Sequence, residues 1–325
     1  MTEKTKPTQL TENLWDLYDC AHSANTKTAY LLDIVSFFDW LGKQPDPQEM
    51  PLSTDAVIDF LVARSDKDAL STLKRRLSAL SWAHKSIGYL GADNPCLSPT
   101  VREAVKLLGR KYTKENRTTI GVASPLSLKQ IRKIVKLCKA DENKIRGARD
   151  RAIFLVGFSG GLRRSEIVGL EWENIEEVVE GLEITMKRSY SDQKEYSVVV
   201  RCCRGRVPTT CPVRALNDWR EVGGNHEGRV FRRLSKSGKL LAPLHPSGDA
   251  INELVRARMR ELGHSGWKKY GGHSLRKGFA ATAIDGGASI AAVKEQGRWM
   301  SEATIMHSVK NSDGWGSAAS AKLGL

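Results

Sequence analysis

The first third of the chain carries apolar residues at the three- and four-residue spacing of amphipathic helices. Prolines at positions 45, 47 and 51 break the pattern once, and polar capping residues such as Asn25 and Ser53 stand where helices begin. Four helices are expected, over about 25–41, 53–64, 71–85 and 99–112. The expected inward positions are Leu31, Ile34, Val35, Phe38 and Leu41, then Val57, Ile58, Leu61 and Val62, then Leu73, Leu77, Leu80 and Ala83. Residues 1–112 therefore predict an all-α domain.

Residues 113–125 are polar, contain Gly and Pro and show no period, which is typical of a linker. Beyond them, two stretches at 181–187 and 196–201 have the alternation of strands, with 189–193 as the turn between them. Helices are expected after Ser127 and over 149–159, 212–220, 246–262, 275–286, 290–296 and 301–309. Residues 126–325 thus predict a mixed α/β domain, mostly helical, with a small antiparallel sheet.

The composition fits a soluble globular protein: 40% of the 325 residues are hydrophobic and 27% are charged. No apolar run approaches the ~20 residues of a membrane-spanning helix, and the N-terminus lacks a signal-peptide apolar region. We expect a cytoplasmic, nucleoid-associated protein. The six cysteines form no metal-binding spacing, so reduced thiols are expected and no metal site.

The net charge of +14 indicates a polyanionic partner. Residues 1–112 hold 14 basic and 14 acidic residues, so the entire excess lies after Tyr112. A neutral domain can still present one basic helix face. In the segment that begins at Ser71, such a face would suit a DNA groove or would simply be solvated. The candidate DNA-binding residues are Lys27, Lys74, Arg75, Ser78, Ser81 and Lys85.

Three clusters carry candidate chemistry. Arg163 follows Gly160-Gly161, at a helix start suited to holding a phosphate, with Glu166 one turn on. In Gly272-His-Ser-Leu-Arg, His273 and Arg276 can aim at one point, although a lone His is more often structural. In Gly297-Arg-Trp, the indole of Trp299 can pack in the core or donate to a phosphate oxygen.

The order of the clusters, Arg, then His-x-x-Arg, then Gly-x-Trp, resembles the tyrosine recombinase (phage integrase) family, in its Cre-like branch. The resemblance covers nearly the whole chain. It implies that Arg163 and Arg276 hold the scissile phosphate, Glu166 supports Arg163, His273 assists proton transfer, and Trp299 packs against the phosphate or donates to it. It also implies double-stranded DNA as partner, assembly to dimers or tetramers on DNA, and no metal or nucleotide cofactor.

The sequence departs from the family pattern at the nucleophile. The tyrosine should stand nine residues after the tryptophan position, where Ser308 is found, and no tyrosine follows Tyr270. A serine hydroxyl is far less acidic than a phenol and does not reach as far. The general-acid lysine belongs on the hairpin, where Tyr190 matches its context and Lys187 or Lys194 flanks the turn.

These departures leave alternatives open. The leading hypothesis is a specific DNA-binding protein that arranges sites, alone or with a partner recombinase, but does not cut. The second is an active recombinase whose nucleophile has been substituted, and a third reading uses an unconventional nucleophile. A DNA-binding regulator outside the recombinases would leave the arginines and the histidine without a purpose.

Overall fold

A computed structural model describes residues 24–117, 123–186, 197–224, 226–235, 237, 240–243 and 248–309. The described residues divide into two compact units, one before Gly121 and one from Gly121 onward. Each unit has its own buried apolar core. Within the described ranges, no helix is both long and apolar enough to cross a bilayer.

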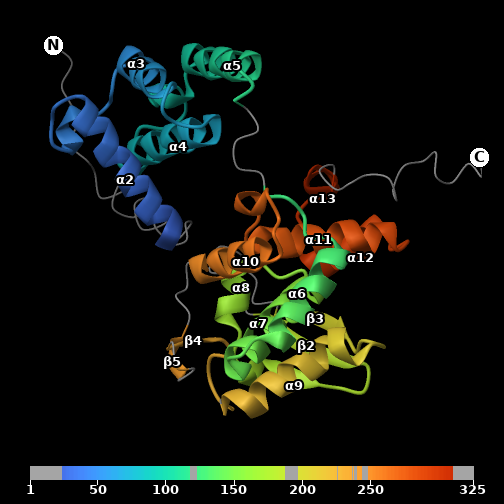
Figure 1. Cartoon of the computed structure of the whole chain (residues 1–325). Coiled ribbons are helices and arrows are strands. Elements are labelled where there is room, and N and C mark those ends of the chain that lie inside the picture. The colour runs from blue at the N-terminus through green and yellow to red at the C-terminus, as the bar shows by residue number, and fades with distance from the viewer. Residues whose placement is uncertain are drawn as a thin grey trace, which may run out of the picture. The chain divides into compact units, whose positions relative to one another are not determined.

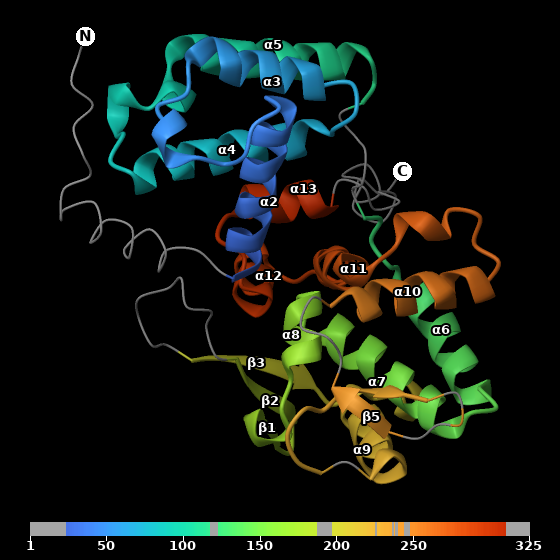
Figure 2. The ribbon, with the colours of Figure 1, turned by 90° about the vertical axis from the view of Figure 1, so that its left-hand side faces the viewer.

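The described part of the first unit is helical, as the sequence predicts. Helix α4 packs against α2, α3 and α5, and α3 and α5 lie side by side (Figures 1 and 2). The side chain of Ser53 caps α3, and that of Ser98 caps α5, which has Pro99 in its first turn. The four helices are α2 (Ala24–Trp40), α3 (Thr54–Arg64), α4 (Leu70–Ser86) and α5 (Pro99–Lys114).

Three expected core positions in this unit are wrong. The side chains of Leu31, Val35 and Val62 are 54%, 41% and 51% exposed. Helix α2 instead buries Phe37, which the periodicity did not select and which packs edge-to-face on Phe60 with ring centroids 5.1 Å apart. Aromatic rings bury more apolar area than aliphatic side chains, so the Phe37 face turns inward.

The second unit is built around α7, which packs against α6, α9 and α11 (Figure 1). Helix α6 begins with a capping box, in which Ser127 and Gln130 satisfy each other's backbone N–H groups. The side chains of α7 from Ala152 to Val156 are all buried. The helices are α6 (Leu128–Ala140), α7 (Lys144–Ser159), α8 (Arg164–Gly169), α9 (Pro212–Gly223), α10 (Asp249–Glu261), α11 (Gly272–Asp285), α12 (Ile290–Gly297) and α13 (Glu302–Val309).

An antiparallel sheet of order β1-β2-β3 completes this unit, and its β2–β3 hairpin confirms the expected one. Leu182 and Ile184 point into the core as their alternation predicts. The expected turn at 189–193 lies outside the described residues. The short strands β1, β4 and β5 were not predicted. The strands are β1 (Ile175–Glu177), β2 (Gly181–Met186), β3 (Val198–Cys203), β4 (Arg232–Leu234) and β5 (Leu240–Pro243).

A buried ionic group ties three helices of this unit together. The guanidinium of Arg258, on α10, donates to Asp141 at the end of α6 over 2.8 Å and to Asp150 of α7 over 2.6 Å. All three side chains are at least 94% buried. This fixes α10 against α6 and α7, and α11, which carries candidate site residues, follows α10 in the chain and packs on it.

Candidate phosphate-binding site

Arg163 lies at the N-terminus of α8, directly after a glycine turn. Gly161 has a φ of +55°, a conformation that favours glycine, and a Cβ there would lie 2.7 Å from the ring of Phe279. Both conditions require glycine, so the turn that delivers Arg163 depends on Gly161. The side chain of Arg163 remains 42% exposed.

Glu166 holds Arg163 through two hydrogen bonds. Its Oε1 accepts from Arg163 Nη1 over 2.7 Å, and its Oε2 accepts from the backbone N–H of Arg163 over 2.6 Å. The carboxylate therefore fixes both the guanidinium and the first backbone donor of α8. The structure thus brings together the two residues whose spacing placed them on one helix face.

Arg276, on α11, is a buried cation beside this pair. Its Nη1 donates to the carbonyl of Gly161 over 2.7 Å, and its Cζ lies 3.9 Å from the ring centre of Trp299. Burial, followed by the charge of Arg163, lowers the pKa of Arg276 to about 9, although Glu166 opposes the shift. None of the ion pairs among the described residues involves Arg276. Among the described residues, no carboxylate therefore lies within ion-pair distance of its positive charge.

His273 lies one turn before Arg276, on the exposed side of α11. Partial desolvation lowers the pKa of its imidazole, and the charges of Arg164, Arg276, Lys277 and Arg163 lower it further. The lowered pKa favours the neutral form of the imidazole, and the charges of Arg163 and Arg276 both act on it. A neutral imidazole can donate a hydrogen bond to a phosphate oxygen or accept a proton.

Trp299 is buried between Arg276 and Phe279, on which it stacks with an interplanar angle of 6°. A Cβ at Gly297 would lie 1.7 Å from this indole, which explains the Gly-x-Trp spacing. The packing on Arg276 is what the structure shows for this residue. Donation from its indole to a phosphate remains a prediction.

Arg298 completes the cluster, and sequence reasoning gave it no role. Its Nη2 donates to Glu166 Oε2 over 2.6 Å, and its carbonyl accepts from Arg163 Nη2 over 3.0 Å. Its φ of +57° is rare for a residue with a side chain. The sequence offered one indication of its importance: Arg298 stands between Gly297 and Trp299, in the motif whose tryptophan was already a candidate site residue.

Ser308 lies in α13, whose described side chains Ile305 and Val309 are buried in the same apolar cluster as Trp299. The backbone at position 308 thus belongs to a helix packed on α11. The side chain of Ser308 lies outside the described residues, as do Lys187, Lys194 and Tyr190. Their roles at the site stay predictions.

The expected basic face of α4 is partly correct. Lys74, Arg75 and Ser78 are exposed, and Arg75 also forms an ion pair with Asp33 of α2. Ser81 is wrong as a member of the exposed face: it is buried, and its hydroxyl accepts from the amide of Asn94 over 3.2 Å. The polar side chain of Ser81 turns inward because it satisfies that buried amide.

Lys85 and Lys27 are half-buried. The contacts of the whole set with DNA remain predictions.

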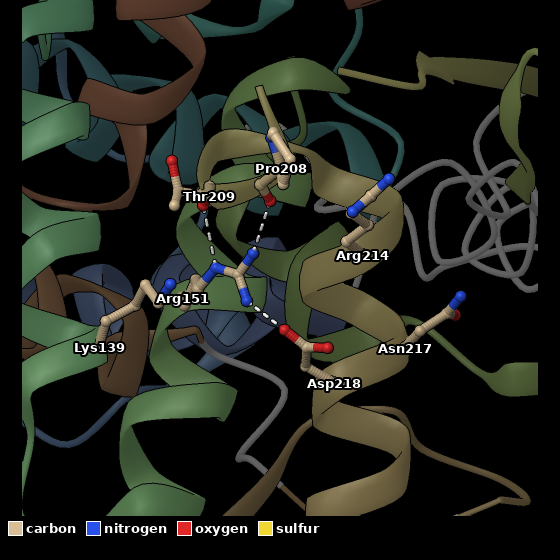
Figure 3. A pocket seen from close by; sticks show the side chains of 7 residues that line it. All are labelled: Lys139, Arg151, Pro208, Thr209, Arg214, Asn217 and Asp218. Atoms are coloured by element: carbon tan, nitrogen blue, oxygen red, sulfur yellow. Dashed lines mark hydrogen bonds and ion pairs between the residues drawn. The ribbon is translucent and has the colours of Figure 1, made fainter. Parts of the chain in front are cut away.

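A separate pocket of about 380 Å³ lies among α6, α7 and α9 (Figure 3). Its buried arginine, Arg151, donates to the carbonyls of Pro208 and Thr209 over 3.1 Å each and pairs with Asp218. These bonds use the guanidinium to hold the loop before α9. Arg163, Arg276 and Arg298 do not line this pocket. Because the guanidinium of Arg151 is already used inside the protein, the candidate site is the cluster around Arg163 and not this pocket.

The fold and the sequence place the chain in one family: it belongs to the phage integrase (tyrosine recombinase) family. Residues 125–313 match that family, and residues 10–85 match its N-terminal SAM-like domain. A matching relative is an integrase/recombinase xerD homolog of Selenomonas ruminantium, 28% identical over 283 residues, which cover 86% of this chain and 80% of the relative. The tyrosine recombinase XerD of Lacticaseibacillus casei is 25% identical over 284 residues, covering 83% and 82%.

Solved structures show the same fold. The Tn1549 transposon integrase in complex with transposon right end DNA has a TM-score of 0.60 and 13% identity, over 91% of this chain and 94% of that one. A lambda integrase dimer bound to a core site has a TM-score of 0.58 and 15% identity, over 94% and 95%.

Proposed function

We propose that this protein binds a specific duplex DNA site with the phosphate-holding residues of a tyrosine recombinase, and that it does not cut the strand through position 308. The observation that carries the proposal is Arg276, a buried guanidinium outside the ion pairs of the described residues, next to Arg163. A buried cation is costly unless it is paired. A DNA phosphate would supply the missing charge.

The arrangement suits a phosphodiester. Toward the described residues, Arg163 uses one N–H group on Glu166 and one on the Arg298 carbonyl, and Arg276 uses a single donor, so both guanidinium groups have further N–H groups to offer a phosphate. Together they can neutralise charge on the non-bridging oxygens while the neutral His273 donates to one of them. Strand cutting would also need a nucleophile in line with the phosphate. The aliphatic hydroxyl of Ser308 is less acidic than a phenol and shorter in reach.

The named relatives support the choice of partner. A Tn1549 integrase and a lambda integrase have been solved with DNA, the latter also as a tetramer on a Holliday junction. By analogy, this chain would assemble on two DNA sites in the manner of the Cre-like branch, alone or with a cutting partner. Its function would be to hold and align sites in the cell's DNA.

The test begins by selecting a bound site from a pool of random duplexes with the full chain. The selected duplex is then prepared with a phosphorothiolate at successive positions, so that any strand cleavage traps a covalent adduct. We expect no adduct with the native chain. A covalent adduct mapped to any residue would overturn the proposal that this chain does not cut DNA, and would support an unconventional nucleophile.

The variant Ser308→Tyr separates the remaining readings. An adduct at the introduced tyrosine shows that the rest of the site is competent, as in a recombinase whose nucleophile was substituted. No adduct, with binding retained, shows that a second part of the phosphate-activating site is also missing. The general-acid lysine is tested by the same variant on an all-oxygen duplex, because a thiolate leaving group needs no proton whereas an alkoxide does. Arg276→Ala should weaken binding and lower its salt dependence, with Arg201→Gln on the sheet as a control for losing one surface charge. Unchanged binding by Arg276→Ala would favour a regulator that does not use this site.

A further inference from the structure

Arg298 occupies a backbone conformation that an arginine rarely adopts. It ends α12 with φ +57° and ψ +47°, and its N–H closes the helix on the carbonyls of Lys294 and Glu295. Among the described residues, Asn116 is the other non-glycine residue with a positive φ. Asparagine tolerates this conformation, whereas an arginine there is strained. Backbone conformations of this kind cluster at functional sites and persist only where the surrounding structure maintains them.

The guanidinium of Arg298 is directed into the phosphate-binding cluster. It is 13% exposed, and it donates from Nη2 to Glu166 and from Nη1 to the carbonyl of Gln296 over 2.9 Å. Its Nε is buried without a partner among the described residues. The positive charge of Arg298 is therefore paired inside the protein, with the carboxylate of Glu166.

Glu166 in turn acts on Arg163. With Arg298 present, the carboxylate accepts from three donors: the Arg163 backbone, the Arg163 guanidinium and the Arg298 guanidinium. The backbone carbonyl of Arg298 also accepts from Arg163 Nη2. Arg298 thus holds Arg163 at one nitrogen directly and at the other through Glu166.

We propose that Arg298 is a positioning residue of the phosphate-binding site, which fixes the guanidinium of Arg163 through Glu166 without touching DNA. The inference rests on the proposed function. It goes further by assigning the role of a residue that lies between Gly297 and Trp299. The adjacent Trp299 packs on Arg276, so one turn of chain orients both arginines.

The first experiment is a double-mutant cycle between Arg298→Gln and Arg163→Ala, with affinity for the selected duplex as the readout. Arg298→Gln should weaken binding about tenfold in the native chain and less than about twofold when Arg163 is already alanine, because contacting residues couple strongly. Equal weakening in both backgrounds would show that Arg298 contacts DNA itself, and no weakening in the native chain would show that it does not position Arg163. Either result overturns the proposal.

Two further variants separate the side chain from the backbone turn. Arg298→Gly keeps the turn, since glycine favours this φ, and should bind as weakly as Arg298→Gln. Arg298→Lys keeps the charge and should recover part of the affinity. Native-like binding by the glycine variant would contradict the proposed role, because the turn alone would then suffice.

A readout independent of DNA is the titration of Glu166 in the full chain, followed by the NMR signal of its labelled carboxyl carbon and assigned with Glu166→Gln. Glu166 faces Arg163 from α8, Arg298 from the end of α12 and Arg276 from α11. Burial tends to raise the pKa of Glu166, yet the charge of Arg298 and the bonds from Arg163 hold that pKa below its ordinary value.

In Arg298→Gln the pKa of Glu166 should rise, and in Arg201→Gln it should stay unchanged. An unchanged pKa in Arg298→Gln would overturn the positioning role. If Arg163→Ala fails to weaken DNA binding, the proposed function falls, while this titration still decides the role of Arg298.

Discussion

Gly297→Ala should disrupt the candidate phosphate-binding site by displacing the indole ring of Trp299. A Cβ at position 297 would lie 1.7, 2.2 and 2.7 Å from three atoms of the Trp299 indole, far inside van der Waals contact. The backbone of α12 accepts alanine here, because Gly297 does not need a positive φ. The effect is therefore steric, and the indole must leave its place between Arg276 and Phe279.

The magnitude follows from what the ring loses. Overpacking costs about 1–3 kcal/mol. Losing the contact with Arg276 at 3.9 Å and the stack on Phe279 adds about 1–2 kcal/mol. A loss of about 3 kcal/mol would lower the Tm of a unit of this size by about 6–12 °C.

Thermal unfolding monitored by tryptophan fluorescence measures the change in stability. Affinity for the selected duplex shows whether the arrangement of Arg163 and Arg276 is lost with it. Gly109→Ala, in the middle of α5 with its nearest atom 3.8 Å away, is the matched control and should stabilise the first unit by about 0.5–1 kcal/mol. In a Trp299→Ala background, Gly297→Ala should have almost no effect. A native-like Tm for Gly297→Ala would refute the argument that glycine is required by the indole.

Two further predictions concern buried ionisable side chains, those of His84 and Arg258. His84 accepts from the backbone N–H of Leu52 through Nε2 over 3.1 Å, and burial lowers its pKa. The folded state thus binds its proton less readily than the unfolded chain, so this contribution to stability is present above about pH 6.5 and is lost as the pH falls below it, as urea midpoints should show. Arg258→Ala strands the carboxylates of Asp141 and Asp150 and should lower the free energy of unfolding by about 3–5 kcal/mol in urea titrations.

The controls for these two predictions are variants of the same positions. In His84→Gln, which cannot charge, the extra loss of stability below pH 6.5 should vanish, and its persistence would assign the effect to other groups. Arg258→Lys should retain part of the stability. A change below about 1 kcal/mol in Arg258→Ala would show that Arg146 and Arg149 already neutralise the two carboxylates.

The helices and the hairpin could be read from the sequence because their periodicity is long and their caps are explicit. Ser127, Ser53 and Ser98 each cap the helix that follows them. Strands of three or four residues, such as β1 and β4, are too short to show a period, and only the fold pairs them.

Individual inward positions failed where tertiary packing decided between neighbouring faces. Leu31 and Val35 fit a helical stripe, but α2 buries Phe37 instead, because its ring packs on that of Phe60. Ser81 fits a polar face, but the buried amide of Asn94 draws it inward. Sequence patterns give the period of a helix more reliably than the choice between adjacent faces.

From the residue types alone the cluster could be predicted only as separate motifs, and it was the family resemblance that implied their meeting at one phosphate. Arg163, His273 and Arg276 each stand at a helix start after glycine, which the sequence shows. The role of Arg298 depends on a left-handed backbone turn and on a carboxylate 132 residues earlier in the chain. Neither feature leaves a mark in the local sequence.

Helix α13 is anchored by Ile305 and Val309, two aliphatic side chains on either flank of position 308. The packing of α13 on its neighbours therefore does not require an aromatic ring at position 308. Exchange of a single residue there would abolish one chemical step and leave the surrounding scaffold assembled. Under the proposed function, a chain with serine at this position would keep its hold on duplex DNA while the strands stay uncut.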